Sequence, residues 1–236
     1  MRTENRTALI TGASRGFGLS LAERLAKKGW QLLLTARDPS RLLAVRRRLE
    51  QYSIVIAVSG DIKDEIHLLE IAGILESRGL QPELVVNNAS ELGISPLKPL
   101  LEHPVEDLHR VFHTNMIAPV SLLQKIFPYL KEGARIINVT SDAGSEAYET
   151  WGAYGGSKAG LDHMTSVLGR ENPGYKFYAF DPGDMRTDMQ QAAFPGEDIS
   201  DRPLPGDYAV PAIMQLIEGS KPGGRYTVQT LVKQLL

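Results

Sequence analysis

The sequence predicts a Rossmann-type α/β fold, a doubly wound parallel sheet of about seven strands with helices on both faces in three αβα layers. Short β-rich runs alternate with longer helical patterns along the 236 residues. The runs are apolar almost throughout, as in parallel strands that are buried on both faces. The first run ends in a glycine-rich turn that opens a helix. Together these three observations indicate a doubly wound parallel sheet.

Each strand and crossover helix has a local signal. We expect strands at Thr7–Thr11, Gln31–Thr35, Ile54–Val58, Leu84–Asn87, Arg135–Thr140, Lys176–Phe180 and Arg225–Val228. Helical patterns long enough for crossovers lie between them at Gly18–Gly29, Pro39–Gln51, Lys63–Gly79, Pro104–Lys131 and Ala153–Arg170. The second helix has a clear start, with Asp38 as N-cap and Pro39 at its first position.

Length and composition limit the function classes. A chain of 236 residues fits a single α/β domain over 1–236. A net charge of −2 gives no basic field for nucleic acid or an anionic membrane, so neither is an expected partner. The absence of cysteine excludes disulfides and thiol catalysis. Residues 1–5 are polar and carry no apolar leader, which makes the cytoplasm the expected location.

The turn from Thr11 to Gly18 reads Thr-Gly-Ala-Ser-Arg-Gly-Phe-Gly. Glycines at 12, 16 and 18 let the chain turn tightly and let its backbone approach a pyrophosphate, which the helix N-terminus stabilises. Ser14, Arg15 and Phe17 lie in the same turn and are further cofactor candidates. A plain strand-to-helix turn is the alternative.

The tip of the second strand discriminates between dinucleotides. Where an NAD site places a carboxylate for the ribose, this chain has Ala36 and then Arg37. Arg37, with Arg15 from the glycine-rich turn, suits a 2′-phosphate and so predicts NADP(H). The alternative is that Arg37 is only solvated and Asp38 reaches the ribose. Asp61, after the third strand, is either an adenine contact or the N-cap of the helix near Lys63.

Tyr154 and Lys158 stand four residues apart in a helical pattern, and Ser141 precedes the tyrosine by thirteen residues. Residues four apart share a helix face, so the ammonium of Lys158 is expected beside the phenol of Tyr154, where it lowers the pKa of that phenol. Tyrosine then becomes a usable acid-base group. This constellation beside a dinucleotide turn predicts nicotinamide redox chemistry.

Several separated motifs occur in one order: the glycine-rich turn, Asn87-Asn88-Ala89, Asn115, Ser141, Tyr154-x-x-x-Lys158, and Pro182-Gly183 with Thr187. With them the chain resembles the short-chain dehydrogenase/reductase (SDR) family, in its shorter single-domain branch, over about positions 5 to 190. The resemblance implies that Asn88, Ala89, Pro182, Gly183 and Thr187 contact the cofactor.

The resemblance also implies a catalytic tetrad of Asn115, Ser141, Tyr154 and Lys158. Tyr154 would exchange a proton with the substrate oxygen, and Ser141 would hydrogen-bond that oxygen. Lys158 would lower the pKa of the tyrosine and hold the nicotinamide ribose, while Asn115 would fix a water that relays protons. A single asparagine tolerated in a helix is the alternative for Asn115. The chain departs from the family pattern at Ser90, where a glycine is usual, and at Gly155-Gly156.

The substrate end is less distinctive. Tyr148 and Trp151, between Ser141 and Tyr154, should border the pocket, as should Asp184, Met185, Met189 and Phe194 within a substrate loop at about 184–207. For Tyr148 and Trp151, packing in the core or between subunits fits equally well. The Pro- and Gly-rich stretch Gln190–Asp207 predicts a lid, with a static connector as the alternative. His109 and His113 lack a third ligand nearby, so no metal is expected.

We therefore expect an NADP(H)-dependent carbonyl reductase or alcohol dehydrogenase that acts on a small-molecule carbonyl compound or alcohol. The alternative from another class is a non-catalytic NADPH-binding sensor or scaffold. The family resemblance suggests a homodimer or homotetramer built on the helices around 104–130 and 153–170.

Overall fold

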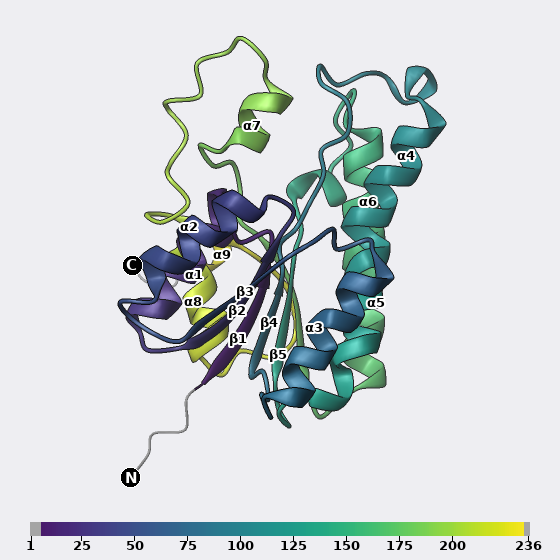
Figure 1. The fold of residues 1–236 in the computed structure, drawn as a ribbon. Coiled ribbons are helices and arrows are strands. Elements are labelled where there is room, and N and C mark those ends of the chain that lie inside the picture. The colour runs from purple at the N-terminus through teal and green to yellow at the C-terminus, as the bar shows by residue number, and fades with distance from the viewer. Residues whose placement is uncertain (1–5, 234–236) are drawn as a thin grey trace.

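One parallel sheet organises residues 6–233, the part of the chain that the computed structural model describes. Residues 1–5, in which no leader is expected, lie outside the described residues. The seven strands of the described part run in the order β3-β2-β1-β4-β5-β6-β7 (Figure 1). They are β1 (Thr7–Thr11), β2 (Gln31–Ala36), β3 (Val55–Ser59), β4 (Leu84–Asn87), β5 (Arg135–Val139), β6 (Lys176–Asp181) and β7 (Gly224–Thr227). The predicted fold class is confirmed, and each strand boundary lies within one residue of its expected place.

Helices cover both faces of the sheet (Figure 1). On one face lie α1 (Gly16–Lys27), α2 (Pro39–Leu49), α8 (Ala209–Glu218) and α9 (Val228–Val232). On the other lie α3 (Glu65–Ser77), α4 (Val105–Phe112), α5 (Ala118–Ile126) and α6 (Gly152–Glu171). Successive strand residues point to opposite faces of the sheet and pack in two separate hydrophobic cores. Ile10 and Leu34 pack with α1 and α8, whereas Leu9 and Leu33 pack with α3 and α5. The strand order reverses between β1 and β4, which creates a crevice at the carboxyl ends of these strands.

The helix expected over Pro104–Lys131 is not continuous. After α4 the chain widens into a π-helical turn at His113–Ile117, continues as α5, and ends in a 3-10 turn at Phe127–Tyr129. Pro119 has no N–H to direct at the carbonyl of Asn115, which an α-helix requires at this spacing. The side chain of Asn115 also bonds outside its own helix, to Glu91 and Ser157. Both features favour the local departure from α-helical geometry.

Three short or late helices were not expected. The stretch Gln190–Asp207 is not irregular throughout, because α7 (Asp188–Ala193) occupies its first residues and is capped by Thr187, whose hydroxyl accepts from the N–H of Gln190 at 3.2 Å. Helices α8 and α9 also lie beyond the predicted set. The alternative that Asp61 caps the third helix is wrong, because α3 begins at Glu65 and Asp64 caps it by accepting from the N–H of Ile66.

Candidate active site

A cavity of about 860 Å³ opens at the carboxyl ends of the strands and gathers most of the predicted site residues. Those that line it are Gly12, Ser14, Arg15, Gly16, Phe17, Arg37, Asp61, Asn88, Ala89, Ser141, Tyr148, Trp151, Tyr154, Lys158, Pro182, Gly183, Met185, Thr187 and Met189. Gly18 and Asn115 lie behind this lining rather than in it. Residues from both ends of the chain thus form one elongated site.

The glycine-rich turn is held by Asn88. The amide nitrogen of Asn88 donates to the carbonyl of Thr11 at 2.9 Å and to that of Gly12 at 3.1 Å. A Cβ at Gly12 would lie 2.9 Å from this nitrogen, and one at Gly18 would lie closer still. Both positions therefore need glycine, and Gly12 also has a φ of +66°. Helix α1 begins at Gly16 without a side-chain cap, which leaves its first N–H groups free for an anion.

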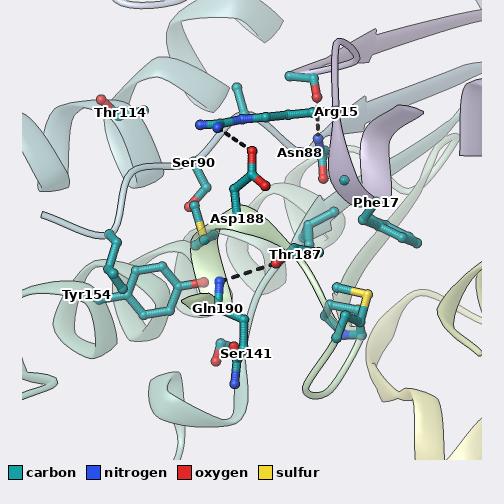
Figure 2. Close-up of a pocket in the computed structure, with 18 of the residues that line it drawn as sticks. Arg15, Phe17, Asn88, Ser90, Thr114, Ser141, Tyr154, Thr187, Asp188 and Gln190 are labelled. Atoms are coloured by element: carbon teal, nitrogen blue, oxygen red, sulfur yellow. Dashed lines mark hydrogen bonds and ion pairs between the residues drawn. The ribbon is translucent and has the colours of Figure 1, made fainter. Parts of the chain in front are cut away.

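The two arginines expected at a 2′-phosphate differ in their surroundings. Arg37 lines the cavity, is exposed, and makes no ion pair with any described residue. Arg15 instead pairs with Asp188 of α7 at 2.8 Å, so it connects the glycine-rich turn to the substrate loop (Figure 2). Asp38 caps α2 by accepting from the N–H of Arg41 at 3.0 Å, as expected, and also pairs with the guanidinium of Arg41.

Tyr154 and Lys158 come from the first turns of α6 and are both buried. The ammonium of Lys158 donates to the carbonyl of Val139 at 2.7 Å and lies 5.5 Å from the centre of the Tyr154 ring. Burial raises the pKa of Tyr154, and the hydroxyls of Ser90 and Ser141 oppose that rise through hydrogen bonds. Burial lowers the pKa of Lys158 to about 8, against the nearby charge of Asp162. The expected lowering of the tyrosine pKa by Lys158 is therefore not found, because desolvation dominates both groups.

Asn115 has no spare hydrogen-bonding capacity in its side chain. Its amide nitrogen donates to the carbonyl of Glu91 at 2.8 Å and to the hydroxyl of Ser157 at 2.9 Å. Its amide oxygen accepts from the N–H of Glu91 at 2.8 Å and from the hydroxyl of Ser90 at 3.1 Å. These four bonds use both N–H groups and both lone pairs. Asn115 thus braces the wall behind Tyr154, and its side chain offers no acceptor to the expected relay water.

Ser141 and Tyr148 meet at a carboxylate. The hydroxyl of Ser141 donates to Asp142 at 2.9 Å, and the phenol of Tyr148 donates to the second oxygen of Asp142 at 3.2 Å. The charge of Asp142, followed by its hydrogen bond, raises the pKa of Tyr148. Asp142 lines the cavity beside Ser141 and was not among the predicted site residues. It directly follows the predicted catalytic residue Ser141 in the sequence, and this adjacency could have identified it.

Aromatic side chains form the far wall of the cavity. Trp151 packs edge-on against Tyr154, with ring centres 5.7 Å apart, and lies 6.1 Å from Phe194. Met189 joins this cluster, whereas Met185 packs against the main core. The labelled side chains of Ser90, Ser141 and Tyr154 border the same space (Figure 2). Ser90 stands where the family pattern has glycine, and sequence reasoning considered only its backbone.

Between residues 6 and 233 no group of three or more His, Asp or Glu side chains is placed to hold a metal ion. In the same part of the chain no helix is both long and apolar enough to cross a membrane.

Comparison with known proteins agrees with this geometry. The family model for short chain dehydrogenases matches residues 6–198. An NADPH-dependent pterin aldehyde reductase of Arabidopsis thaliana is 30% identical over 94% of this chain and 93% of its own length. A benzil reductase of Bacillus cereus is 31% identical over 78% of each chain. A short chain dehydrogenase structure from Shigella flexneri, complexed with NADP, superimposes with a TM-score of 0.88 at 26% identity and covers 95% of this chain and 97% of its own.

Proposed function

This chain belongs to the short-chain dehydrogenase family of oxidoreductases, and from that premise we propose that it is an NADP(H)-dependent reductase of small-molecule carbonyl compounds. The observation that carries the proposal is the convergence, in one cavity, of an anion-binding turn, an unpaired arginine and the set Ser141, Tyr154 and Lys158. The NADPH-dependent relative and the NADP-complexed structure support the choice of cofactor.

The cavity fits a dinucleotide phosphate at its nucleotide end. The uncapped N-terminus of α1 suits the pyrophosphate, and Gly12 and Gly16 allow the left-handed backbone, with φ of +66° and +55°, that shapes the turn before it. Arg37 is the described cation at the tip of β2 without an ion-pair partner, as a 2′-phosphate requires. Asp61 and Lys158 lie in the same lining, at the positions proposed for the adenine and the nicotinamide ribose.

The other end supplies the acid-base groups. NADPH, when bound, would supply a hydride to the carbonyl carbon. Tyr154 then donates its proton to the carbonyl oxygen while Ser141 hydrogen-bonds that oxygen. The raised pKa of Tyr154 keeps the phenol protonated at neutral pH, which is the state that a proton donor for reduction needs. Lys158, charged below a pH of about 8, stabilises the phenolate that forms as the proton leaves.

The test is the oxidation of NADPH in the presence of a panel of aromatic ketones and aldehydes. We expect Tyr154→Phe to lower kcat by about 10²–10⁴, the range for loss of a general acid, with NADPH affinity unchanged within a fewfold because Arg37 and the glycine-rich turn remain. Tyr129→Phe, on the surface 3-10 turn, is the matched control. A kcat of Tyr154→Phe within tenfold of wild type would show that Tyr154 is not the general acid. NADPH binding without turnover of any carbonyl compound would contradict the proposal that the protein is a reductase.

A further inference from the structure

The charges that line the cavity are unevenly paired. Of its carboxylates, Asp38, Asp61, Asp181 and Asp188 each form an ion pair with an arginine or lysine. Asp142 and Asp184 line the cavity as well, and neither forms an ion pair with a described residue. Two lining cations also lack an ion pair with a described residue, namely Arg37 at the nucleotide end and the buried Lys158 beside Tyr154. The substrate end therefore holds two unpaired carboxylates against the one ammonium of Lys158, and its unpaired charge is negative overall.

The two unpaired carboxylates share one neighbourhood. Asp142 accepts from the hydroxyl of Ser141 at 2.9 Å and from the phenol of Tyr148 at 3.2 Å. Asp184 accepts from the side-chain amide of Gln190 at 3.0 Å. Asp142, Asp184 and Tyr148 line the same cavity. The charge of Asp142 and its hydrogen bond raise the pKa of Tyr148, and the charges of Glu146 and Asp184 add to this shift. Asp142 also accepts from the N–H of Ala143 at 2.8 Å. Since a carboxylate accepts about four hydrogen bonds, Asp142 retains one acceptor site and Asp184 retains more than one.

An apolar wall faces this charge. Trp151 and Phe194 pack against each other, and Trp151 also contacts Tyr154 edge-on. A site that combines aromatic walls with a few directed polar groups is typical of small-molecule recognition. Here the directed groups at the substrate end carry negative charge, which attracts a cation in a confined site and repels an anion.

We propose that the substrate is an aromatic carbonyl compound with a positively charged nitrogen two bonds from the carbonyl carbon, and that Asp142 binds this nitrogen with support from Asp184. The proposal rests on the proposed function, because Ser141 fixes where the carbonyl oxygen lies. The hydroxyl of Ser141 lies 2.9 Å from Asp142, so when it turns to donate to the carbonyl oxygen, an ammonium beside the carbonyl comes within reach of the carboxylate. The hydride reaches the carbonyl carbon, Tyr154 gives its proton to the oxygen, and the products are an amino alcohol and NADP⁺.

Three phenyl ketones that differ only in the adjacent group give a matched test: phenacylamine (cationic), 2-hydroxyacetophenone (neutral) and benzoylformate (anionic). At neutral pH we expect kcat/KM to fall in that order, with roughly tenfold or more between the cation and the neutral ketone, the usual effect of a hydrogen bond to a charged group. The difference should lie mainly in KM, since the ammonium contacts Asp142 before and during the reaction.

Asp142→Asn tests the residue. It keeps the size of the side chain and removes the charge, so the ratio of kcat/KM for phenacylamine to kcat/KM for the neutral ketone should drop about tenfold. Asp184→Asn should have a smaller effect in the same direction. Asp201→Asn is the control, because Asp201 lies on the same substrate loop, outside the cavity lining, and pairs with Arg202.

Binding gives a readout that does not depend on turnover. Calorimetric titration of the NADP-loaded protein should show 2-amino-1-phenylethanol binding more tightly than mandelate, with the difference lost in Asp142→Asn. Equal kcat/KM for the three ketones, or tighter binding of mandelate, would overturn the charge preference and leave the reductase standing. If no ketone is reduced, the proposed function fails, and the binding comparison still decides whether the substrate end selects a cation.

Discussion

Lys158 is a buried cation, and such a group costs stability. Its side chain is 2% exposed and its charge has no carboxylate within ion-pair distance among the described residues. Because burial lowers its pKa to about 8 from an ordinary 10.5, the unfolded chain binds more protons between these two values. The contribution of Lys158 to stability therefore rises with pH through this window and is least favourable below about 8.

Because the charged form of Lys158 is disfavoured in the folded chain, its removal should stabilise the fold at neutral pH. At pH 7 we expect the free energy of unfolding of Lys158→Met to exceed that of wild type by up to about 3 kcal/mol. We also expect this variant to lose catalytic activity. The stabilisation should shrink as the pH rises from about 8 toward 10.5, because wild-type Lys158 then sheds its charge in the folded state. Chemical denaturation of both proteins across this range measures the difference. A difference that stays constant with pH would contradict the burial of a charged lysine.

Arg37 carries the second residue-scale prediction. Since it faces the cavity without an ion-pair partner, Arg37→Ala should weaken NADP binding roughly ten- to a hundredfold, the usual range for hydrogen bonds to a charged group, and barely change NAD binding. Calorimetric titration with both dinucleotides measures this. Arg47→Ala removes a neighbouring cation of α2 that does not line the cavity and serves as the control. Equal wild-type affinity for NADP and NAD would show that the arginine does not select the cofactor.

At the residue scale, motif positions could be predicted but their partners could not. Gly12, Ser141, Tyr154 and Lys158 are recognisable because each sits at a fixed distance from a strand end or from another member of the set. The bonds of Asn115 join residues 24 and 42 positions away, and only the folded chain brings these together. For the same reason the local spacing of Tyr154 and Lys158 suggested a lowered tyrosine pKa, whereas the depth at which both are buried determines the opposite direction.

At the element scale, strands were more predictable than helices. A parallel strand that is buried on both faces must be apolar along its whole length, so its ends coincide with the ends of an apolar run. Helix α8 is buried at most positions and carries a proline near its start, which hides the usual amphipathic period. The π-helical turn around Asn115 depends on bonds to distant residues, and a local pattern cannot indicate it.

The substrate loop packs against the residues that line the cavity. Beyond α7 it is anchored to the cavity wall, because the guanidinium of Arg202 lies 5.0 Å from the centre of the Phe194 ring and the N–H of Arg186 donates to the carbonyl of Pro203 at 2.9 Å. Ile199 is also buried. We expect this segment to position Phe194 and to exclude water from Tyr154, as a lid does.

Replacing residues 195–207 by a Gly/Ser linker leaves α7 and the nucleotide end intact. We expect NADPH affinity to be retained, KM for the ketone to rise and kcat to fall, as steady-state kinetics and a cofactor titration can measure. Arg202→Ala, which removes only the contact with Phe194, should show a smaller change of the same kind. Unchanged KM and kcat in the linker variant would make the segment a simple connector.

At the scale of the whole molecule, the helical layer that contains α4, α5 and α6 is a candidate contact surface between copies of the chain. The cavity is lined by residues at and after the carboxyl ends of the strands, and α4, α5 and α6 cover one face of the sheet (Figure 1). Apolar side chains are nevertheless exposed there, with Val105 at 59%, Ile117 at 44% and Val167 at 37%. Scattered exposed apolar residues are common on monomers, but three on neighbouring helices fit a self-complementary contact between two copies.

We therefore propose that the chain forms a homodimer or homotetramer through this face, and that Ile117→Glu with Val167→Glu dissociates it. Light scattering should give a wild-type mass of two or four times 26.0 kDa and a single chain mass for the double variant, since a buried charge without a partner is costly in an interface. Leu43→Glu places the same charge on an equally exposed leucine of α2, in the other layer, and should leave the wild-type mass unchanged. A wild-type protein that already has the mass of one chain would show that these helices face solvent, and the cavity would then be complete within each chain.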